Sequence, residues 1–286
     1  MKIKITGSSG YLGNIISKKL RQNGKNPEGI PRELLYAKKG ELTDFLRGTD
    51  VVVNLAGSPI LTKWTEKKKQ EIYNSRVETT TNLVKAINEL SPETRPKVVV
   101  SASAIGIYKA GKTHDEHSTD FDKGFVGKVV RDWEKALEPL NQNIQKVVFR
   151  IAPVLGKNSE TIKNLRLPFK MGIGGKIGNG KQPFPFVHEK DIAEAFLWAI
   201  DVYDKNGIFN LTAPDSISNK TFTKKFASKL NRPALIPVPG FGLKTIYGES
   251  ANMLIESPQV IPKELQKEGY QFRYPDIDSV LSEILE

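Results

Sequence analysis

The chain has 286 residues, of which 38% are hydrophobic and 26% charged, a composition typical of a globular protein with one large domain or two sharing a core. It has no cysteine, which excludes disulfides, thiolate zinc sites and a cysteine nucleophile, and its three histidines lack metal-ligand spacing, so we predict no metal site. The net charge of +11 is spread over short basic clusters mixed with acids, which favours solvated surfaces and no nucleic-acid partner. The positive excess also suits an anionic small ligand.

The apolar runs, such as VVVNLAG and IAEAFLWAI, are too short to span a bilayer. No charged and apolar leader precedes the first glycine-rich motif. We therefore expect a cytoplasmic protein without a membrane partner.

The first elements are predicted from hydrophobic spacing. Residues 2–6 form an apolar strand, and the helical spacing that follows ends at Asn23-Gly24. A weak strand near 26–31 contains two prolines, whereas residues 49–57 form a strand buried on both faces. Residues 65–90 are predicted to form one long helix, which Ser91-Pro92 ends.

Strands and helices continue to alternate along the chain. We predict strands at 97–103 and 146–156, helices at 125–138 and 191–200, and a short strand GIFNLT. This order favours an α/β fold, a Rossmann-type doubly wound parallel sheet, because parallel strands need crossover helices.

The texture of the sequence changes after Gly156. A glycine-rich loop at 170–186 and a proline-punctuated helical tail suggest a smaller, interleaved C-terminal cap. We predict a nucleotide-binding domain from 1–155 and 187–212, and a substrate-binding cap from 156–186 and 213–286.

Three glycines, Gly7, Gly10 and Gly13, lie where the first strand ends and the first helix begins. In this context the first glycine permits a tight turn, the second lets the backbone approach a pyrophosphate, and the third lets helix and sheet pack closely. The amides at the start of the helix would hold the phosphates. We therefore predict a dinucleotide site.

The end of the second strand distinguishes the two nicotinamide cofactors. Arg32 lies there in the segment EGIPRE, and a guanidinium suits the extra phosphate of NADP. We favour NADP over NAD, while Glu28 and Glu33 keep NAD open as the alternative.

Longer segments carry a more specific resemblance. They are NLAGSPI, KWTEKKKQEIYNSRVETTTNLVKAI, SASAIGIY, RDWE, GIGGKIGNGKQPFPFVHEKDIAEAF and the tail from PALIPVPGF to QFRYPDI. Across essentially the whole chain they resemble the YfcH-like nucleoside-diphosphate-sugar epimerase family. This is an atypical, extended branch of the short-chain dehydrogenase/reductase superfamily with a DUF1731 C-terminal region.

The resemblance implies a set of cofactor contacts at the pyrophosphate, the adenosine ribose phosphate and the ribose, on the long helix and after the sixth strand. In that order they are Gly7, Ser9, Gly10, Tyr11 and Leu12; Pro31 and Arg32; Leu55, Ala56 and Gly57; Glu71 and Arg76; and Val154. From the residues alone, Glu71 and Arg76 could equally form a surface ion pair.

The family's catalytic pattern is only partly present. Extended members use a Tyr and a Lys four residues apart on a helix, with a Ser from the preceding strand end. Ser103 ends its strand at the expected place. Anchoring on Glu134 puts Val126 and Val130 at the Tyr and Lys positions, and neither can move a proton.

Other residues remain as candidates for proton transfer. Tyr108 and Lys112 are four apart but in a predicted loop, so we reject them as the standard pair and keep Tyr108 as a catalytic candidate lining the pocket. Lys128 and Arg131 are further candidates, while His188, before the helix at 191, is more often structural.

Two functions fit these observations. The first is an NADP(H)-dependent oxidoreductase or epimerase acting on a small molecule, with nucleotide sugars as one class. The second is a dinucleotide-binding regulator or scaffold that has lost turnover. The sequence leaves the substrate and the oligomeric state open.

Overall fold

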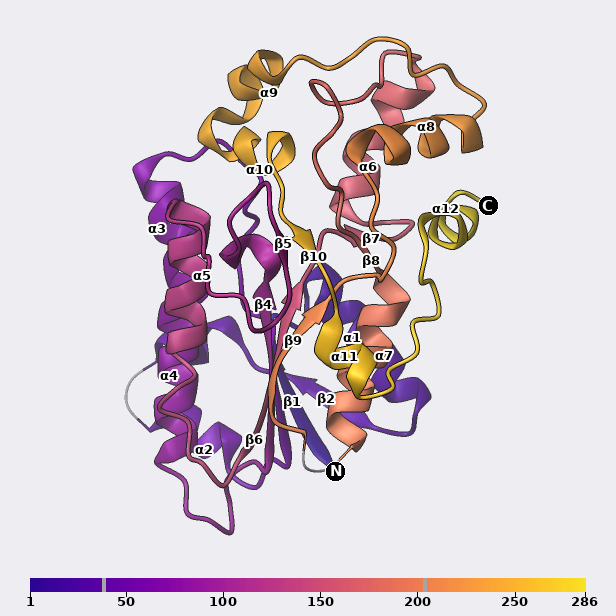
Figure 1. Cartoon of the computed structure of the whole chain (residues 1–286). Coiled ribbons are helices and arrows are strands. Elements are labelled where there is room, and N and C mark those ends of the chain that lie inside the picture. The colour runs from indigo at the N-terminus through magenta and orange to yellow at the C-terminus, as the bar shows by residue number, and fades with distance from the viewer. Residues whose placement is uncertain (38–39, 203–204) are drawn as a thin grey trace.

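The computed structural model describes residues 1–37, 40–202 and 205–286. Its centre is a six-stranded parallel sheet in the order β2-β1-β3-β4-β6-β9, with helices on both faces (Figure 1). The strands are β1 Lys2–Thr6, β2 Asn26–Gly29, β3 Val51–Asn54, β4 Val98–Ala104, β6 Gln145–Ile151 and β9 Gly207–Leu211. The predicted Rossmann-type architecture is confirmed.

The helices fall into those that cover the sheet and those in the upper part of Figure 1 or the tail. The first group is α1 Tyr11–Gln22, α2 Glu41–Leu46, α3 Glu66–Asn74, α4 Val77–Asn88, α5 Phe125–Lys135 and α7 Glu189–Asp201. The second is α6 Glu160–Lys170, α8 Asn219–Lys229, α9 Gly240–Tyr247, α10 Asn252–Ile255, α11 Lys263–Lys267 and α12 Ile277–Leu285. None of the described helices is both long and apolar enough to cross a membrane.

Both faces of the sheet are buried, which explains the unbroken valine runs of its strands. On one face, α1 and α7 pack through Ile16 and Phe196 against strand residues such as Ile5 and Phe149. On the other face, α2 and α4 cover Val52 and Val99. Because β1, β3 and β4 pair in parallel, their carboxyl ends meet at one edge of the sheet.

Two predicted elements are interrupted. The helix expected at 65–90 is two helices, because the chain turns at Ser75, whose hydroxyl donates to the Ile72 carbonyl and accepts from the Ser58 amide. The strand expected at 146–156 is β6 and a short β7 Val154–Leu155, because Pro153 between them has no amide hydrogen for the ladder. β7 pairs instead with β8, Val187–His188.

A third hydrophobic cluster lies outside the sheet and joins segments far apart in the sequence. Ile162 and Phe169 of α6, Phe222 of α8 and Leu281 of α12 belong to it. Part of the C-terminal tail packs back toward the sheet domain: β10 Gln259–Val260 pairs with β5 Thr113–His114 in a separate two-stranded sheet, and Tyr270 joins the first cluster. The predicted domain boundaries stay a prediction.

Candidate functional site

The turn between β1 and α1 is a tight glycine turn at the sheet edge. Gly7 has a φ of +65°, and a Cβ there would lie 2.8 Å from the Leu55 carbonyl oxygen. A Cβ on Gly13 would lie 2.2 Å from the Gly7 carbonyl oxygen. Gly10 caps α1 without a side-chain hydrogen bond, so the first amides of α1 keep no side-chain partner. These amides are donors of the kind that hold an anion at a helix start.

The segment after β3 packs directly beside this turn. The Thr6 hydroxyl accepts hydrogen bonds from the amides of Leu55 and Ala56 at 2.9 and 3.0 Å and donates to Asn54 at 2.8 Å. The Asn54 amide in turn donates to Ser101 of β4. Thr6 and Asn54, which the sequence analysis missed, therefore hold three strand ends in register. Their only sequence signal is a polar residue at the end of an apolar strand.

Arg76, at the break between α3 and α4, brings a half-buried positive charge to the same segment. A Cβ on Gly57 would lie 3.0 Å from its guanidinium carbon. The guanidinium donates only to the carbonyls of Ile72 and Ser58, and no ion pair to it occurs in the described parts of the chain. Burial lowers the pKa of Arg76 to about 10, so the side chain remains a cation at neutral pH. Such a charge is suited to an anionic ligand.

Arg32 and Glu71 lie near each other at the surface. Pro31 precedes the short 3-10 helix Arg32–Tyr36, and Arg32 is exposed. The pKa of Glu71 is lowered chiefly by its hydrogen bond from Lys68, with smaller contributions from Arg32 and Ser58. The structure thus brings Arg32 and Glu71 together, whereas the hydrogen bonds of Arg76 go to the carbonyls of Ile72 and Ser58 instead of Glu71. The alternative of an ion pair between Glu71 and Arg76 is not what the structure shows.

Ser103, near the end of β4, contacts a buried ion pair. Its hydroxyl donates to the Glu134 carboxylate at 2.6 Å. Arg150 of β6 grips both oxygens of that carboxylate, through Nε at 2.8 Å and a terminal nitrogen at 2.7 Å. The Glu134 and Arg150 side chains are only 13% and 4% exposed. Ser103 is therefore held in one orientation by a carboxylate whose charge is matched.

Tyr108 lies in the interior, only 2% exposed. Its hydroxyl donates to Asn210 of β9 and accepts from Arg150, both at 2.8 Å, and its ring stacks on His114. Burial raises its pKa above the ordinary value, against the opposing effect of Arg150. A proton donor must reach its substrate, and in this structure Tyr108 faces other protein groups instead.

The remaining catalytic candidates interact with groups other than Ser103. Lys112 pairs with Asp120 rather than Tyr108, and Lys128 pairs with Asp132. Val130 is buried in the first cluster, and Val126 contacts the chain at Gly106, where a Cβ would lie 2.7 Å from its methyl. Arg131 donates to a backbone carbonyl.

His188 caps α7, as the structural interpretation predicted. Its Nδ1 accepts from the Lys190 amide at 3.3 Å, and its other ring nitrogen contacts Glu283 of α12 at 2.8 Å. It is fully buried. The histidine thus joins the tail to the core.

Two further predicted positions lie near β7. Val154 is half-buried there. The Tyr11 hydroxyl donates to Glu189, and burial raises the pKa of that carboxyl. Tyr11 therefore links the glycine turn to the start of α7.

The other predicted cofactor contacts differ in exposure. Ser9 and Gly57 are exposed, while Leu12 packs against the first cluster.

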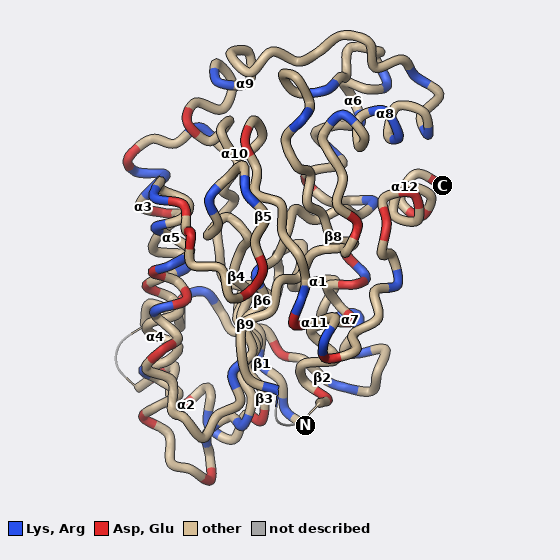
Figure 2. The backbone as a smooth tube through the Cα atoms, viewed as in Figure 1, with Lys and Arg blue, Asp and Glu red and all other residues tan. Residues whose placement is uncertain are grey.

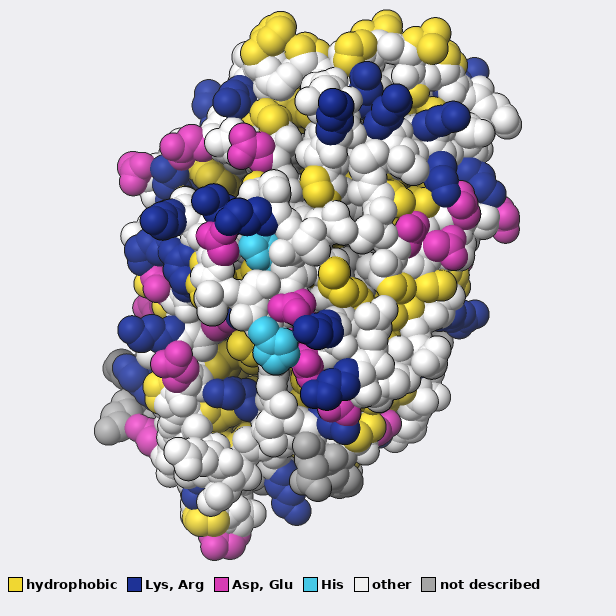
Figure 3. All heavy atoms as spheres, viewed as in Figure 1, with side chains coloured by type: hydrophobic (Ala, Val, Ile, Leu, Met, Phe, Trp, Pro, Cys, Tyr) yellow, Lys and Arg dark blue, Asp and Glu magenta, His cyan; other side chains and the backbone are white. Residues whose placement is uncertain are grey.

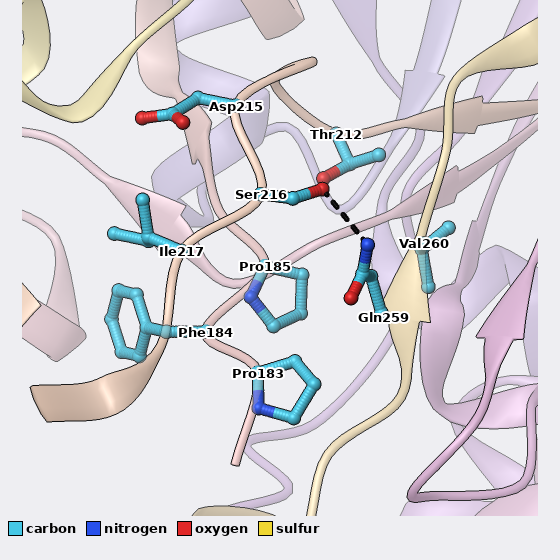
Figure 4. A pocket seen from close by; sticks show the side chains of 9 residues that line it. All are labelled: Pro183, Phe184, Pro185, Thr212, Asp215, Ser216, Ile217, Gln259 and Val260. Atoms are coloured by element: carbon cyan, nitrogen blue, oxygen red, sulfur yellow. Dashed lines mark hydrogen bonds between the residues drawn. The ribbon is translucent and has the colours of Figure 1, made fainter. Parts of the chain in front are cut away.

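A small depression lies between residues 183–185, the loop after β9 and β10 (Figure 4). Its volume is about 10 Å³, room for a single water molecule. Figure 4 shows Pro183, Pro185 and Gln259 facing it, with the Gln259 amide donating to Ser216 at 3.3 Å. We assign it no substrate.

The sheet order and the glycine turn at the sheet edge define a Rossmann-type α/β protein. The model of the NAD dependent epimerase/dehydratase family matches residues 3–212, and a domain of unknown function, DUF1731, matches 238–284. The chain therefore belongs to the NAD dependent epimerase/dehydratase family. This confirms the predicted resemblance.

Similar proteins extend over the whole chain. The mouse epimerase family protein SDR39U1 is 32% identical, with 100% of both chains covered. The crystal structure of human SDR39U1 (isoform 2) with NADPH is 32% identical, with a TM-score of 0.92 and coverage of 100% of this chain and 99% of that one. MoeE5, solved with UDP-glucuronic acid and NAD, has a TM-score of 0.80, covers 100% and 98%, and at 18% identity shares the fold alone.

Proposed function

We propose that the protein is a cytoplasmic NADP(H)-binding oxidoreductase or epimerase of the short-chain dehydrogenase type. The observation that carries the proposal is the continuous seat formed by Gly7, the segment 55–57 and Arg76. An uncapped helix start and a half-buried cation, which has no carboxylate partner among the described residues, adjoin the same segment. The NADPH in the human relative's structure supports the choice of cofactor.

Different residues would contact different parts of the cofactor. The amides of the turn from Gly7 to Gly13 would hold the diphosphate, and Leu12 would pack beside it. Arg32, which is exposed and forms no ion pair with the described residues, would hold the additional adenosine phosphate through its guanidinium fork. Arg76 would supply a fixed positive charge near Gly57.

The bound nicotinamide would supply hydride exchange, and the chain itself must orient the reacting oxygen. Ser103, although only 4% exposed, would serve this role, because Glu134 and Arg150 fix the direction of its hydroxyl. While Ser103 donates to Glu134, its oxygen lone pairs remain for a substrate hydroxyl. Glu134 is a positioning residue. We propose a small substrate, with nucleotide sugars as the first class to test.

A second function is favoured by the valines at the predicted Tyr and Lys positions. Val126 and Val130 pack against apolar neighbours, and Tyr108 is buried, so none of these three positions presents a phenol beside Ser103. A dinucleotide-binding regulator without turnover would have this arrangement. Both functions require the same cofactor seat.

The seat is tested by fluorescence titration with NADPH and with NADH. The protein should bind NADPH more tightly, and Arg32→Ala should weaken NADPH by at least about tenfold while changing NADH little. Arg21→Ala is the matched control, because Arg21 is also exposed and pairs with no carboxylate in the described parts of the chain. If neither nucleotide binds, both functions are wrong.

Turnover distinguishes the two functions. NADPH oxidation is measured with a panel of carbonyl compounds, and epimerisation with UDP-sugars, for the wild type, Ser103→Ala and the exposed Ser91→Ala. An enzyme should lose activity only in Ser103→Ala. Nucleotide binding with no turnover in any panel favours the regulator.

A further inference from the structure

The outer end of the cap carries most of the molecule's exposed large apolar side chains. Eight of the eleven in the described residues lie in 156–186 and 213–255: Leu167, Met171, Ile173, Leu235, Ile236, Phe241, Ile246 and Met253. Leu235 is 85% and Phe241 77% exposed. Figure 3 shows apolar side chains along this end, at the top of the view. We call these eight residues the cap tip.

The segments of the cap tip are joined to one another. Residues 176–178 and 238 exchange backbone hydrogen bonds at 2.8 and 2.9 Å, which places the loop after α6 beside the segment leading into α9. α9 follows at once and buries none of its own residues. An apolar helix with no buried residue indicates an interaction surface.

Unpaired cations surround the cap tip. The same two segments contain twelve Lys and Arg but only three Asp and Glu. Within the described residues, only Lys225 of these twelve forms an ion pair. Lysines elsewhere, such as Lys19, Lys69 and Lys128, are paired. Figure 2 shows the blue positions on α6 and α8 and in their loops, and Figure 3 shows a band of them below the apolar end.

We propose that the cap tip docks on an anionic lipid surface. Protruding aliphatic and Phe side chains would enter the interface between headgroups and acyl chains, and the unpaired lysines would contact the lipid phosphates. Charge complementarity selects this occupant. A protein interface would instead be depleted in lysine and enriched in Tyr, Trp and Arg.

This inference is independent of the proposed catalytic function. It also departs from the expectation of no membrane partner, which rested on the lack of a spanning segment and a leader. A peripheral contact needs neither. The cofactor seat, at the carboxyl edge of the sheet, is separate from the cap tip.

Co-sedimentation of the full chain with vesicles tests the proposal. The protein should bind phosphatidylcholine vesicles containing about a third phosphatidylserine, bind phosphatidylcholine alone weakly, and lose binding as salt rises. Lys170→Gln with Lys244→Gln should weaken binding about 25-fold, at about fivefold per charge. Lys18→Gln with Lys85→Gln changes the net charge equally at exposed, unpaired sites outside the cap and should have little effect.

The apolar contribution needs a second variant. Leu235→Gln with Phe241→Gln alters only highly exposed side chains, so folding should be unchanged and vesicle binding should fall at least about tenfold. Three results would overturn the proposal: no binding to anionic vesicles, equal loss in the Lys18 and Lys85 control, or tight binding of polyglutamate that the apolar variant leaves unchanged. A dimer that the apolar variant dissociates, seen by light scattering, would assign the cap tip to a second copy instead.

Discussion

Replacing Glu134 by Gln should destabilise the protein strongly, because it leaves the buried positive charge of Arg150 without its partner. Gln keeps the shape of the side chain and an acceptor for Ser103, so the change is chiefly the loss of the negative charge facing Arg150. Arg150 is 4% exposed and donates twice to that carboxylate, at 2.7 and 2.8 Å. Removing one partner of such a pair costs about 3–5 kcal/mol.

Thermal unfolding measures this cost. For a chain of this size, about 3 kcal/mol corresponds to a fall in the midpoint of roughly 6–12 °C. Glu138 is exposed and forms no ion pair within the described residues, so Glu138→Gln removes the same charge from the same region and should change stability by less than about 0.5 kcal/mol. Adding Arg150→Met to Glu134→Gln should restore part of the loss, because no charge is then stranded.

Two results would contradict a buried, uncompensated Arg150. One is a thermal unfolding midpoint of Glu134→Gln within about 2 °C of the wild type, and the other is a double variant no more stable than the single one. Either result would mean that water reaches Arg150 and screens it.

Three further predictions concern the buried polar groups. Arg76→Met should leave the unfolding midpoint unchanged or raise it, because a desolvated cation is removed, yet should weaken NADPH binding at least about tenfold in a titration. Tyr108→Phe should lower the free energy of unfolding by about 1–3 kcal/mol in urea, since Arg150 and Asn210 lose their common partner; an unchanged value would contradict the buried network. Burial holds the pKa of His188 below its ordinary 6.5, against the opposing effect of the hydrogen bond that its ring donates to Glu283, and the positive charges of Lys190 and Arg273 nearby lower it further. The unfolded chain therefore takes up a proton first as pH falls, so stability should decline below about pH 6.5, and less steeply in His188→Gln, as followed by urea unfolding at several pH values.

Local patterns predicted the fold well where the chain's own spacing decides the structure. The glycine turn follows from Gly7 and Gly13, because a side chain at either position would collide with neighbouring backbone. The valine runs indicated strands buried on both faces. The break at Ser75 was missed because its cause is a hydrogen bond to Ser58, seventeen positions earlier, and no propensity of the helix itself signals it.

The site was less predictable where it depends on distant contacts. Tyr108 was expected to line a pocket, but its environment is set by Asn210, 102 positions away on β9. Glu134 was used only as an anchor for alignment, and its contact with Ser103 appears once α5 is packed on β4. The proximity of Arg32 and Glu71 likewise requires the folded sheet edge.

Asn210 gives the C-terminal tail a part in the interior of the sheet. Its side-chain oxygen accepts from Tyr108, and its amide nitrogen donates to the Ile261 carbonyl at 3.1 Å, just after β10. A chain cut before β10 would leave that buried donor unsatisfied and uncover Tyr108 and Arg150 behind it. Because Arg150 also binds Glu134, the partner of Ser103, removing the tail should make the position of Ser103 less fixed. The C-terminal residues thus help to order the strand ends without touching them at the cofactor side.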